Sequence, residues 1–208
     1  MAQIIKFPAP ASKLGYTRVK RRKCAENRGQ LDLFPQPTAQ VLDMGFGLNR
    51  FEQALLLDER GDPQAADFYA QAIEQQDCVA DAYCNLGIIE SQKGNRIKAF
   101  DNFTSSLKHD PRHVQAHYNL GNLYFDADDL RLAQMHYQIA TEVEPSFANS
   151  YFNLALVHAI QNDFRAADRS LSQYRGLVSA EEAQIAEELI QNLKDSFSAA
   201  KTSRVASR

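Results

Sequence analysis

A repeated unit constrains the fold of this 208-residue chain more than any other feature. Ala82–Gly87 is followed by a similar stretch, Ala116–Gly121, after an interval of 34 residues. Later positions of the unit recur at the same interval, in the pairs Ala99 and Ala133, Phe103 and Tyr137, and Pro111 and Pro145. A fixed period of this length is typical of stacked units, because a single unit cannot bury its apolar face alone. The sequence therefore predicts an array of repeats.

The spacing within the unit resembles the tetratricopeptide repeat (TPR) family. That family places a Leu-Gly pair, an alanine, an aromatic residue and a proline at fixed offsets. Here these positions hold Leu86-Gly87, Ala99, Phe103 and Pro111, with Tyr83 in the position of the family's tryptophan. The resemblance implies an all-α fold. It would be a right-handed solenoid of about four helix-turn-helix repeats with a C-terminal capping helix and a disordered basic N-terminal arm.

We expect the domain boundaries to follow this repeat. The TPR array would span residues 41–178, with repeats near 46–79, 80–113, 114–147 and 148–178. Ser179–Glu182 has the S-x-x-E pattern of a capping box and predicts a capping helix over 179–198. The polar, basic residues 199–208 are expected to form a disordered tail.

The first 40 residues differ in composition from the rest of the chain. They hold 8 basic and 2 acidic residues, a net charge of +6, whereas residues 41–208 hold 15 basic and 24 acidic residues, a net charge of −9. This stretch has no sustained apolar period, so we expect a disordered arm. The charge asymmetry indicates either two surfaces with different partners or an arm that lies on its own body.

An asparagine precedes the Leu-Gly or Leu-Ala pair in three repeats: Asn85, Asn119 and Asn153. The resemblance implies that these residues face a concave groove. An amide side chain carries donors and an acceptor, so it can pair with both polar groups of an extended peptide backbone. The alternative is that each asparagine bonds a neighbouring turn. Other residues expected in this peptide-binding groove are Tyr118, Asn122, Phe125, Phe152 and Leu156.

A pentapeptide in the arm resembles a second known pattern. Residues Gln30, Leu31, Asp32, Leu33 and Phe34 match the QL[SD]LF peptide by which bacterial replication and repair proteins dock on the DNA sliding clamp. The resemblance implies a bacterial protein and an accessory role at the clamp. The alternatives are that the pentamer occurs by chance or folds back onto the array.

A basic run lies near this pentapeptide, at Arg18, Lys20, Arg21, Arg22 and Lys23. Such a run attracts phosphates by charge alone, so weak nonspecific nucleic-acid contact is one prediction. A solvated basic tail is the other.

The sequence gives little support for catalysis, and an enzyme that uses a histidine pair with a metal is the third alternative. His113 and His117 are spaced as i and i+4, but the glutamate of the HExxH metalloprotease motif is absent. We expect no enzyme activity, catalytic residue, metal or cofactor. The chain start lacks a secretory pattern and no apolar run reaches the ~20 residues of a membrane helix, so we expect a cytoplasmic protein without membrane contact.

The function that we expect is therefore a non-catalytic scaffold. Its TPR groove would bind an extended peptide or a partner protein. The alternative is a replication or repair accessory protein that docks on the sliding clamp.

Overall fold

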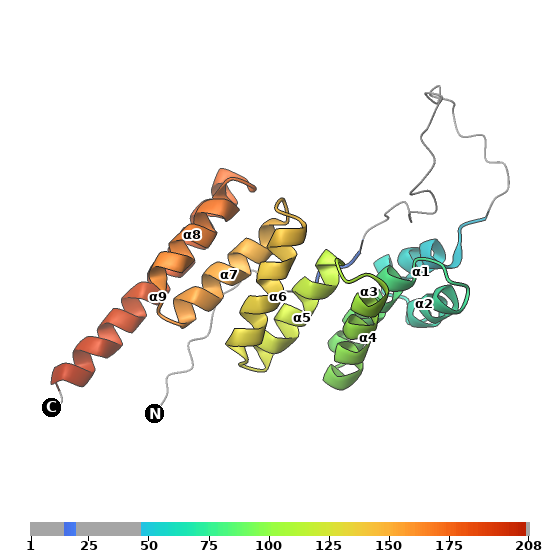
Figure 1. Ribbon diagram of the computed structural model, residues 1–208, viewed down its shortest axis with the longest axis horizontal. Helices are drawn as coiled ribbons and strands as arrows, with labels where there is room; N and C mark the ends of the chain where they lie inside the picture. Colours follow the sequence, from blue (N-terminus) through green and yellow to red (C-terminus); the bar gives the residue numbers. More distant parts are fainter. Residues whose placement is uncertain (1–14, 20–46, 207–208) are drawn as a thin grey trace, which may run out of the picture. The chain divides into compact units, whose positions relative to one another are not determined.

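The computed structural model describes residues 15–19 and 47–206, and all regular structure in these residues is helical (Figure 1). The predicted all-α fold is confirmed. The helices within this part of the chain are α1 (Arg50–Glu59), α2 (Ala65–Glu74), α3 (Val79–Gln92), α4 (Arg96–His109), α5 (Val114–Asp126), α6 (Leu130–Val143), α7 (Ala148–Ile160), α8 (Phe164–Arg175) and α9 (Ala180–Ala206).

The chain divides into two compact units. The α1–α4 unit contains the described residues 18–19 and 47–109, and the α5–α9 unit contains the described residues 15–17 and 110–206. Within each unit, successive helices pack on one another as antiparallel pairs, and α9 packs on both α7 and α8. The pairs α1/α2, α3/α4, α5/α6 and α7/α8 correspond to the four predicted repeats.

Equivalent turns begin the second helices of the last two repeats. The side chain of Asp129 accepts a hydrogen bond from the amide of Leu132 at 3.0 Å, and Asp163 accepts one from Ala166 at 3.0 Å. Each aspartate thereby satisfies an amide that has no partner within its own helix. Asp129 and Asp163 are therefore the N-terminal caps of α6 and α8.

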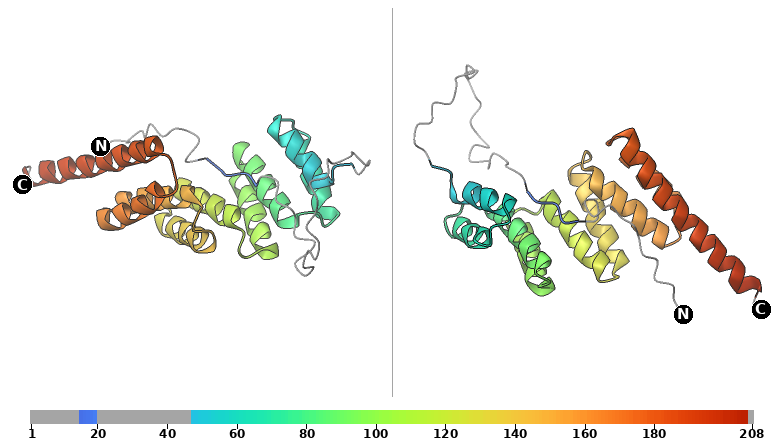
Figure 2. Two further views of the ribbon diagram at one scale, coloured as in Figure 1. Left: turned by 90° about the horizontal axis from the view of Figure 1, so that it is seen from above. Right: turned by 180° about the vertical axis from the view of Figure 1, so that it is seen from behind.

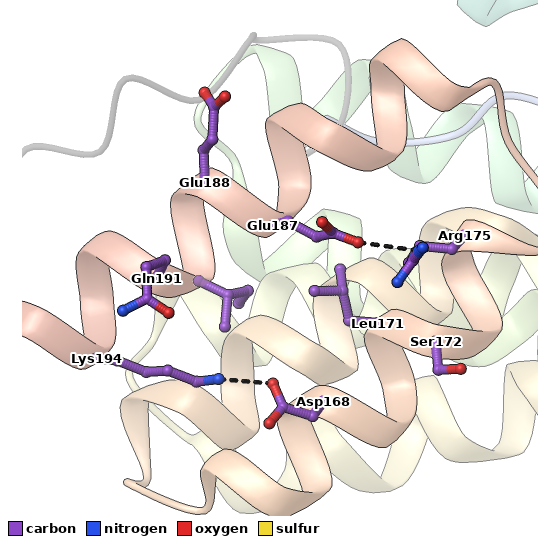
Figure 3. A pocket seen from close by; sticks show the side chains of 9 residues that line it. Asp168, Leu171, Ser172, Arg175, Glu187, Glu188, Gln191 and Lys194 are labelled. Carbon is purple, nitrogen blue, oxygen red and sulfur yellow. Dashed lines mark hydrogen bonds and ion pairs between the residues drawn. The ribbon is translucent and has the colours of Figure 1, made fainter.

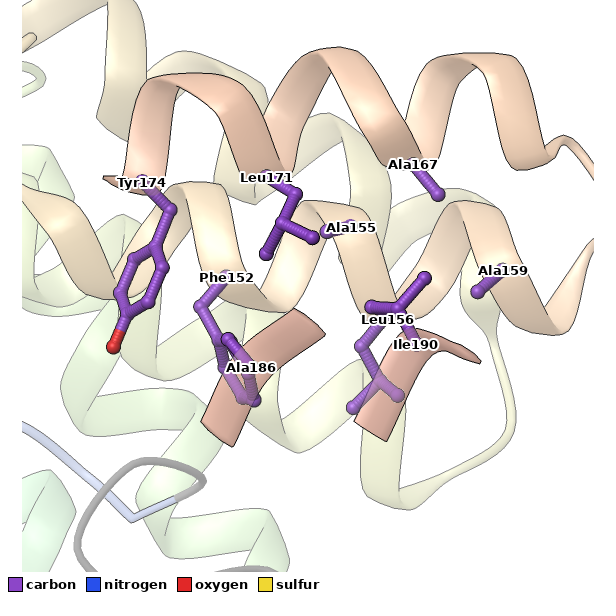
Figure 4. Packing of buried hydrophobic residues seen from close by; sticks show 9 residues of the cluster. All are labelled: Phe152, Ala155, Leu156, Ala159, Ala167, Leu171, Tyr174, Ala186 and Ile190. Carbon is purple, nitrogen blue, oxygen red and sulfur yellow. The ribbon is translucent and has the colours of Figure 1, made fainter. Parts of the chain in front are cut away.

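The glycine of each Leu-Gly pair lies against the aromatic residue of the second helix. A Cβ added to Gly87 would lie 2.5 Å from Cε1 of Phe103, and one added to Gly121 would lie 2.5 Å from Cε1 of Tyr137. In the fourth repeat the glycine is replaced by Ala155. The aromatic position there is Leu171, whose smaller side chain shares a buried cluster with Ala155 (Figure 4).

Helix α9 covers the end of the fourth repeat. Ala186 and Ile190 of α9, each 1% exposed, pack in one cluster with Phe152, Leu156 and Tyr174 (Figure 4). The predicted capping helix is confirmed. It begins as expected, with the amide of Glu182 donating to Oγ of Ser179 at 3.3 Å.

The end of α9 differs from the sequence prediction. The helix continues past residue 198 to Ala206 and runs beyond the ends of α7 and α8 (Figure 2). The prediction of a disordered tail over 199–208 is therefore wrong for residues 199–206. No proline or glycine follows Gly176 in the sequence, so nothing in this stretch forces the helix to end. None of the described helices combines the length and the apolar character needed to cross a membrane.

Candidate peptide-binding site

Side chains of α5 form hydrogen bonds with the backbone of Gly15 and Thr17 and so hold residues 15–17 against this helix. The amide N–H of Thr17 donates to Oδ1 of Asn119 at 2.8 Å, and Nδ2 of Asn119 donates to the carbonyl oxygen of Thr17 at 3.1 Å. Asn119 is fully buried. Its amide thus satisfies both polar backbone groups of one extended residue, which is the pairing that the sequence predicts for a bound peptide.

The carbonyl oxygen of Gly15 is held by two further α5 side chains. It accepts from the hydroxyl of Tyr118 at 3.3 Å and from Nδ2 of Asn122 at 3.4 Å. Burial raises the pKa of Tyr118, so its hydroxyl stays protonated and can donate at neutral pH. The carbonyl oxygen of Gly15 therefore meets two donors from one helix. We call Tyr118, Asn119 and Asn122 the α5 amide face.

The same pairing recurs on α3 in the α1–α4 unit. The amide of Val19 donates to Oδ1 of Asn85 at 3.0 Å, and Nδ2 of Asn85 is 3.4 Å from the carbonyl oxygen of Val19. Nδ2 also lies 3.1 Å from the hydroxyl of Tyr69 on α2. Asn85 is fully buried and Val19 is 1% exposed.

Arg18 forms an ion pair with a buried carboxylate. Its Nη2 is 2.8 Å from Oδ1 of Asp58 on α1 and 3.3 Å from Oε1 of Gln92 on α3. Asp58 is 5% exposed and also accepts a hydrogen bond from the hydroxyl of Tyr69 at 3.2 Å. Burial raises the pKa of Asp58, and the positive charge of Arg18 opposes that shift. We call Asp58, Tyr69, Asn85 and Gln92 the α3 site.

Asn153 is the equivalent asparagine of the fourth repeat, but it bonds a side chain of α5 where Asn85 and Asn119 bond the backbone of residues 15–19. Its Nδ2 donates to Oδ1 of Asn122 at 2.9 Å, and Asn122 also accepts from the hydroxyl of Tyr137 at 2.7 Å. Oδ1 of Asn153 is buried and has no hydrogen-bond partner among the described residues. Asn153 thus orients Asn122 and leaves one buried acceptor open.

The other predicted groove residues lie in the hydrophobic core. Phe152 and Leu156 are 3% and 1% exposed and belong to the cluster that α9 covers (Figure 4). Phe125 is partly buried and packs against the same cluster. These three residues therefore contribute to the packing of the α5–α9 unit.

Sequence reasoning missed residues 15–19 and the acidic part of the α3 site. Within the predicted arm, these five residues have a defined position without helix or strand, and the rest of the arm lies outside the described residues. Thr17 and Val19 are β-branched residues in alternate positions, which is a weak signal for extended backbone. Asp58 follows Phe51 and Ala54 at helical spacing on the buried side of α1, so a charged residue on an apolar stripe was the signal available.

Two sequence predictions cannot be followed in the structure. The clamp-like residues Gln30–Phe34 and the basic residues Lys20–Lys23 lie outside the described part of the chain. The clamp motif and the nucleic-acid contact stay predictions. Arg18, the remaining member of the basic run, is engaged with Asp58.

His117 and His136 form a partly buried contact. Nδ1 of His117 is 3.0 Å from Nδ1 of His136, and Nε2 of His117 is 3.1 Å from the carbonyl oxygen of Pro111. His113 caps α5 by accepting from the amide of Ala116 at 3.1 Å. Among the described residues, no three His, Cys, Asp or Glu side chains are grouped as they would be around a metal ion.

A cleft of about 500 Å³ separates α8 from α9 (Figure 3). Lys194 pairs with Asp168 at 2.7 Å and Arg175 pairs with Glu187 at 2.9 Å along its walls. These ion pairs join the two helices across the cleft. Its charged groups thus hold α9 on α8.

Comparison with known proteins agrees with this architecture. The family model described as "Tetratricopeptide repeat" matches residues 114–147. This stretch is a tetratricopeptide repeat, and the chain has the fold of TPR proteins. Among solved structures, a TPR protein from Parabacteroides merdae is 15% identical with a TM-score of 0.60, covering 72% of this chain and 60% of that one.

Two further proteins are similar to this chain at low identity, MamA in structure and a human protein in sequence. MamA from Desulfovibrio magneticus is 16% identical with a TM-score of 0.53, over 62% of this chain and 73% of that one. The human protein named "Protein O-mannosyl-transferase TMTC3" is 26% identical over 129 residues. That match covers 62% of this chain and only 14% of the human protein, so it concerns one part of a much longer molecule.

Proposed function

We propose that this protein is a non-catalytic interaction scaffold that holds an extended peptide segment of a partner on the α5 amide face and on the α3 site. The observation that carries the proposal is the paired bonding of Thr17 to Asn119 and of Val19 to Asn85. In both cases a buried amide contacts the N–H and the carbonyl oxygen of the same residue. The TPR fold supports the proposal, because its stacked helices provide such a repeated surface.

The hydrogen bonds fit an extended ligand of varied sequence. They address the backbone, which every peptide shares, and they recur at Thr17 and Val19, two residues apart. In an extended chain, the N–H and the carbonyl oxygen of one residue point to the same side, so a single amide side chain can bond both. The buried, unpartnered Oδ1 of Asn153 would accept a further amide of a longer ligand.

A peptide titration tests the proposal. The probe is a fluorescent peptide with the sequence of residues 14–20, and the host is the full-length chain carrying Val19→Asp. This change puts a charge at a buried position and should release the internal segment. We expect the peptide to bind, and we expect Asn119→Ala added to the host to weaken binding at least tenfold.

The matched control is Gln138→Ala, which removes an exposed amide from α6. It should leave both the binding and the melting temperature unchanged. Equal binding by the Asn119→Ala and Gln138→Ala hosts would contradict the proposed role of the amide face.

A further inference from the structure

The buried carboxylate of Asp58 is compensated by the guanidinium of Arg18, which belongs to the segment of residues 15–19. Asp58 is 5% exposed, and burial raises its pKa, while the positive charge of Arg18 and the hydrogen bond from Tyr69 oppose that rise. A buried carboxylate is costly unless a charge or hydrogen bonds compensate it. When the segment leaves, Asp58 keeps the hydroxyl of Tyr69 and loses the cation.

The acceptors around Arg18 come from two different helices. Asp58 lies on α1 and Gln92 at the end of α3, and both meet the same guanidinium nitrogen, at 2.8 and 3.3 Å. A side chain that satisfies this position needs a positive charge and several donors, as arginine has. Glutamine is shorter than arginine and lacks the charge.

Position 19, directly after Arg18, requires an apolar side chain and not a charged one. Val19 is 1% exposed, and its backbone is fixed by both bonds to Asn85. A residue held in extended backbone and buried to this degree is best apolar and β-branched. A charged side chain there would be buried without a partner.

We infer that the α3 site selects peptides in which an arginine is followed directly by a β-branched apolar residue. This inference rests on the proposed function and adds a sequence preference to it. Residues 18–19 are the internal copy of this ligand. Because they are tethered to the site, a partner peptide has to compete with a high local concentration of them.

The test compares two labelled peptides on one host, the full-length Val19→Asp chain. One peptide has the sequence of residues 14–20, and the other carries Arg18→Gln. We expect the arginine peptide to bind at least tenfold more tightly. Adding Asp58→Asn to the host should bring the two peptides within about twofold of each other, and the wild-type chain should bind the arginine peptide at least tenfold more weakly than the Val19→Asp host.

Changing the peptide leaves the protein intact, so the comparison does not depend on whether Asp58→Asn folds. Equal affinity of the two peptides for the Val19→Asp host would overturn the arginine preference and leave the proposed function standing. Persistence of a tenfold preference in the Asp58→Asn host would also overturn it. If neither peptide binds, the proposed function fails together with the inference.

Discussion

Asn119 and Thr17 exchange two hydrogen bonds, one from the backbone amide at 2.8 Å and one to the backbone carbonyl at 3.1 Å. An asparagine that bonds both groups of one residue replaces the partner that a neighbouring β-strand would supply. Asn85 and Val19 repeat the arrangement in the other unit. Each asparagine therefore contacts the backbone of residues 15–19, while Arg18 contacts Asp58 through its side chain.

The contact between Gly87 and Phe103 predicts a steric penalty. Gly87→Ala would place a methyl group 2.5 Å from the ring, which forces the ring or the helix to move. We expect a loss of about 1–3 kcal/mol in the free energy of unfolding, measured by urea denaturation. Gly94→Ala is not a suitable control, because Gly94 has a positive φ of 81°.

The pair Ala155 and Leu171 supplies the matched control for this prediction. Phe103→Leu in the Gly87→Ala background recreates the residue pair of the fourth repeat. The double variant should be more stable than the sum of the two single effects predicts, by about 1 kcal/mol. If the losses in free energy of unfolding of the two single variants simply add in the double variant, the ring of Phe103 is not the reason why alanine destabilises position 87.

Ala133 tests the register of the repeats. It is fully buried on α6 with Tyr118 and Tyr137, so Ala133→Asp would bury an unpaired charge. We expect this variant to unfold or to lose more than about 3 kcal/mol. Met135→Asp on the same helix, where the side chain is 43% exposed, should melt close to wild type by circular dichroism. Similar melting curves for both variants would contradict the register.

The histidine pair predicts a loss of stability in acid. The carbonyl oxygen of Pro111 accepts a hydrogen bond from Nε2 of His117, so Nδ1 of neutral His117 accepts from Nδ1 of His136. Burial lowers the pKa of both histidines, that of His136 to about 4. Because the folded pKa lies below the unfolded value of about 6.5, this contribution is complete above about pH 6.5 and declines as the pH falls toward 4.

Thermal melting at several pH values measures this effect. Acidification from pH 7 to pH 5 should cost the wild type on the order of 1 kcal/mol more than the His136→Gln variant. The amide side chain introduced by this substitution could still donate to His117 and does not titrate. The same pH dependence in both proteins would show that His136 does not contribute to it.

Local spacing was enough to predict the repeats. The positions of Gly87 and Phe103, or of Gly121 and Tyr137, are fixed by contacts within one helix pair, and the repeat displays them twice. The capping helix was also predictable, since Ser179–Glu182 and the apolar positions Ala186 and Ile190 are local signals. Its end was not, because residues 199–206 mix alanine and valine with polar and basic residues and contain no proline or glycine that would end a helix.

The ligand of the asparagines could not be predicted from the sequence. Thr17 and Asn119 are separated by 102 residues and Val19 and Asn85 by 66, and no periodic pattern links them. The basic run predicts a phosphate contact or solvent for Arg18, whereas its partner in the structure is the carboxylate of Asp58. The role of Asp58 as a partner of Arg18 follows from its burial beside Tyr69, which the sequence does not display.

Hydrogen exchange at the amide of Thr17 tests the central claim most directly, because that amide is the donor to Asn119. In the full-length wild-type protein we expect it to be protected, and in Asn119→Ala to exchange at least fivefold faster. The amide of Leu132, bonded to Asp129, should be unchanged and thereby report intact folding. An unprotected Thr17 amide in the wild type, or equal protection in the variant, would contradict the account.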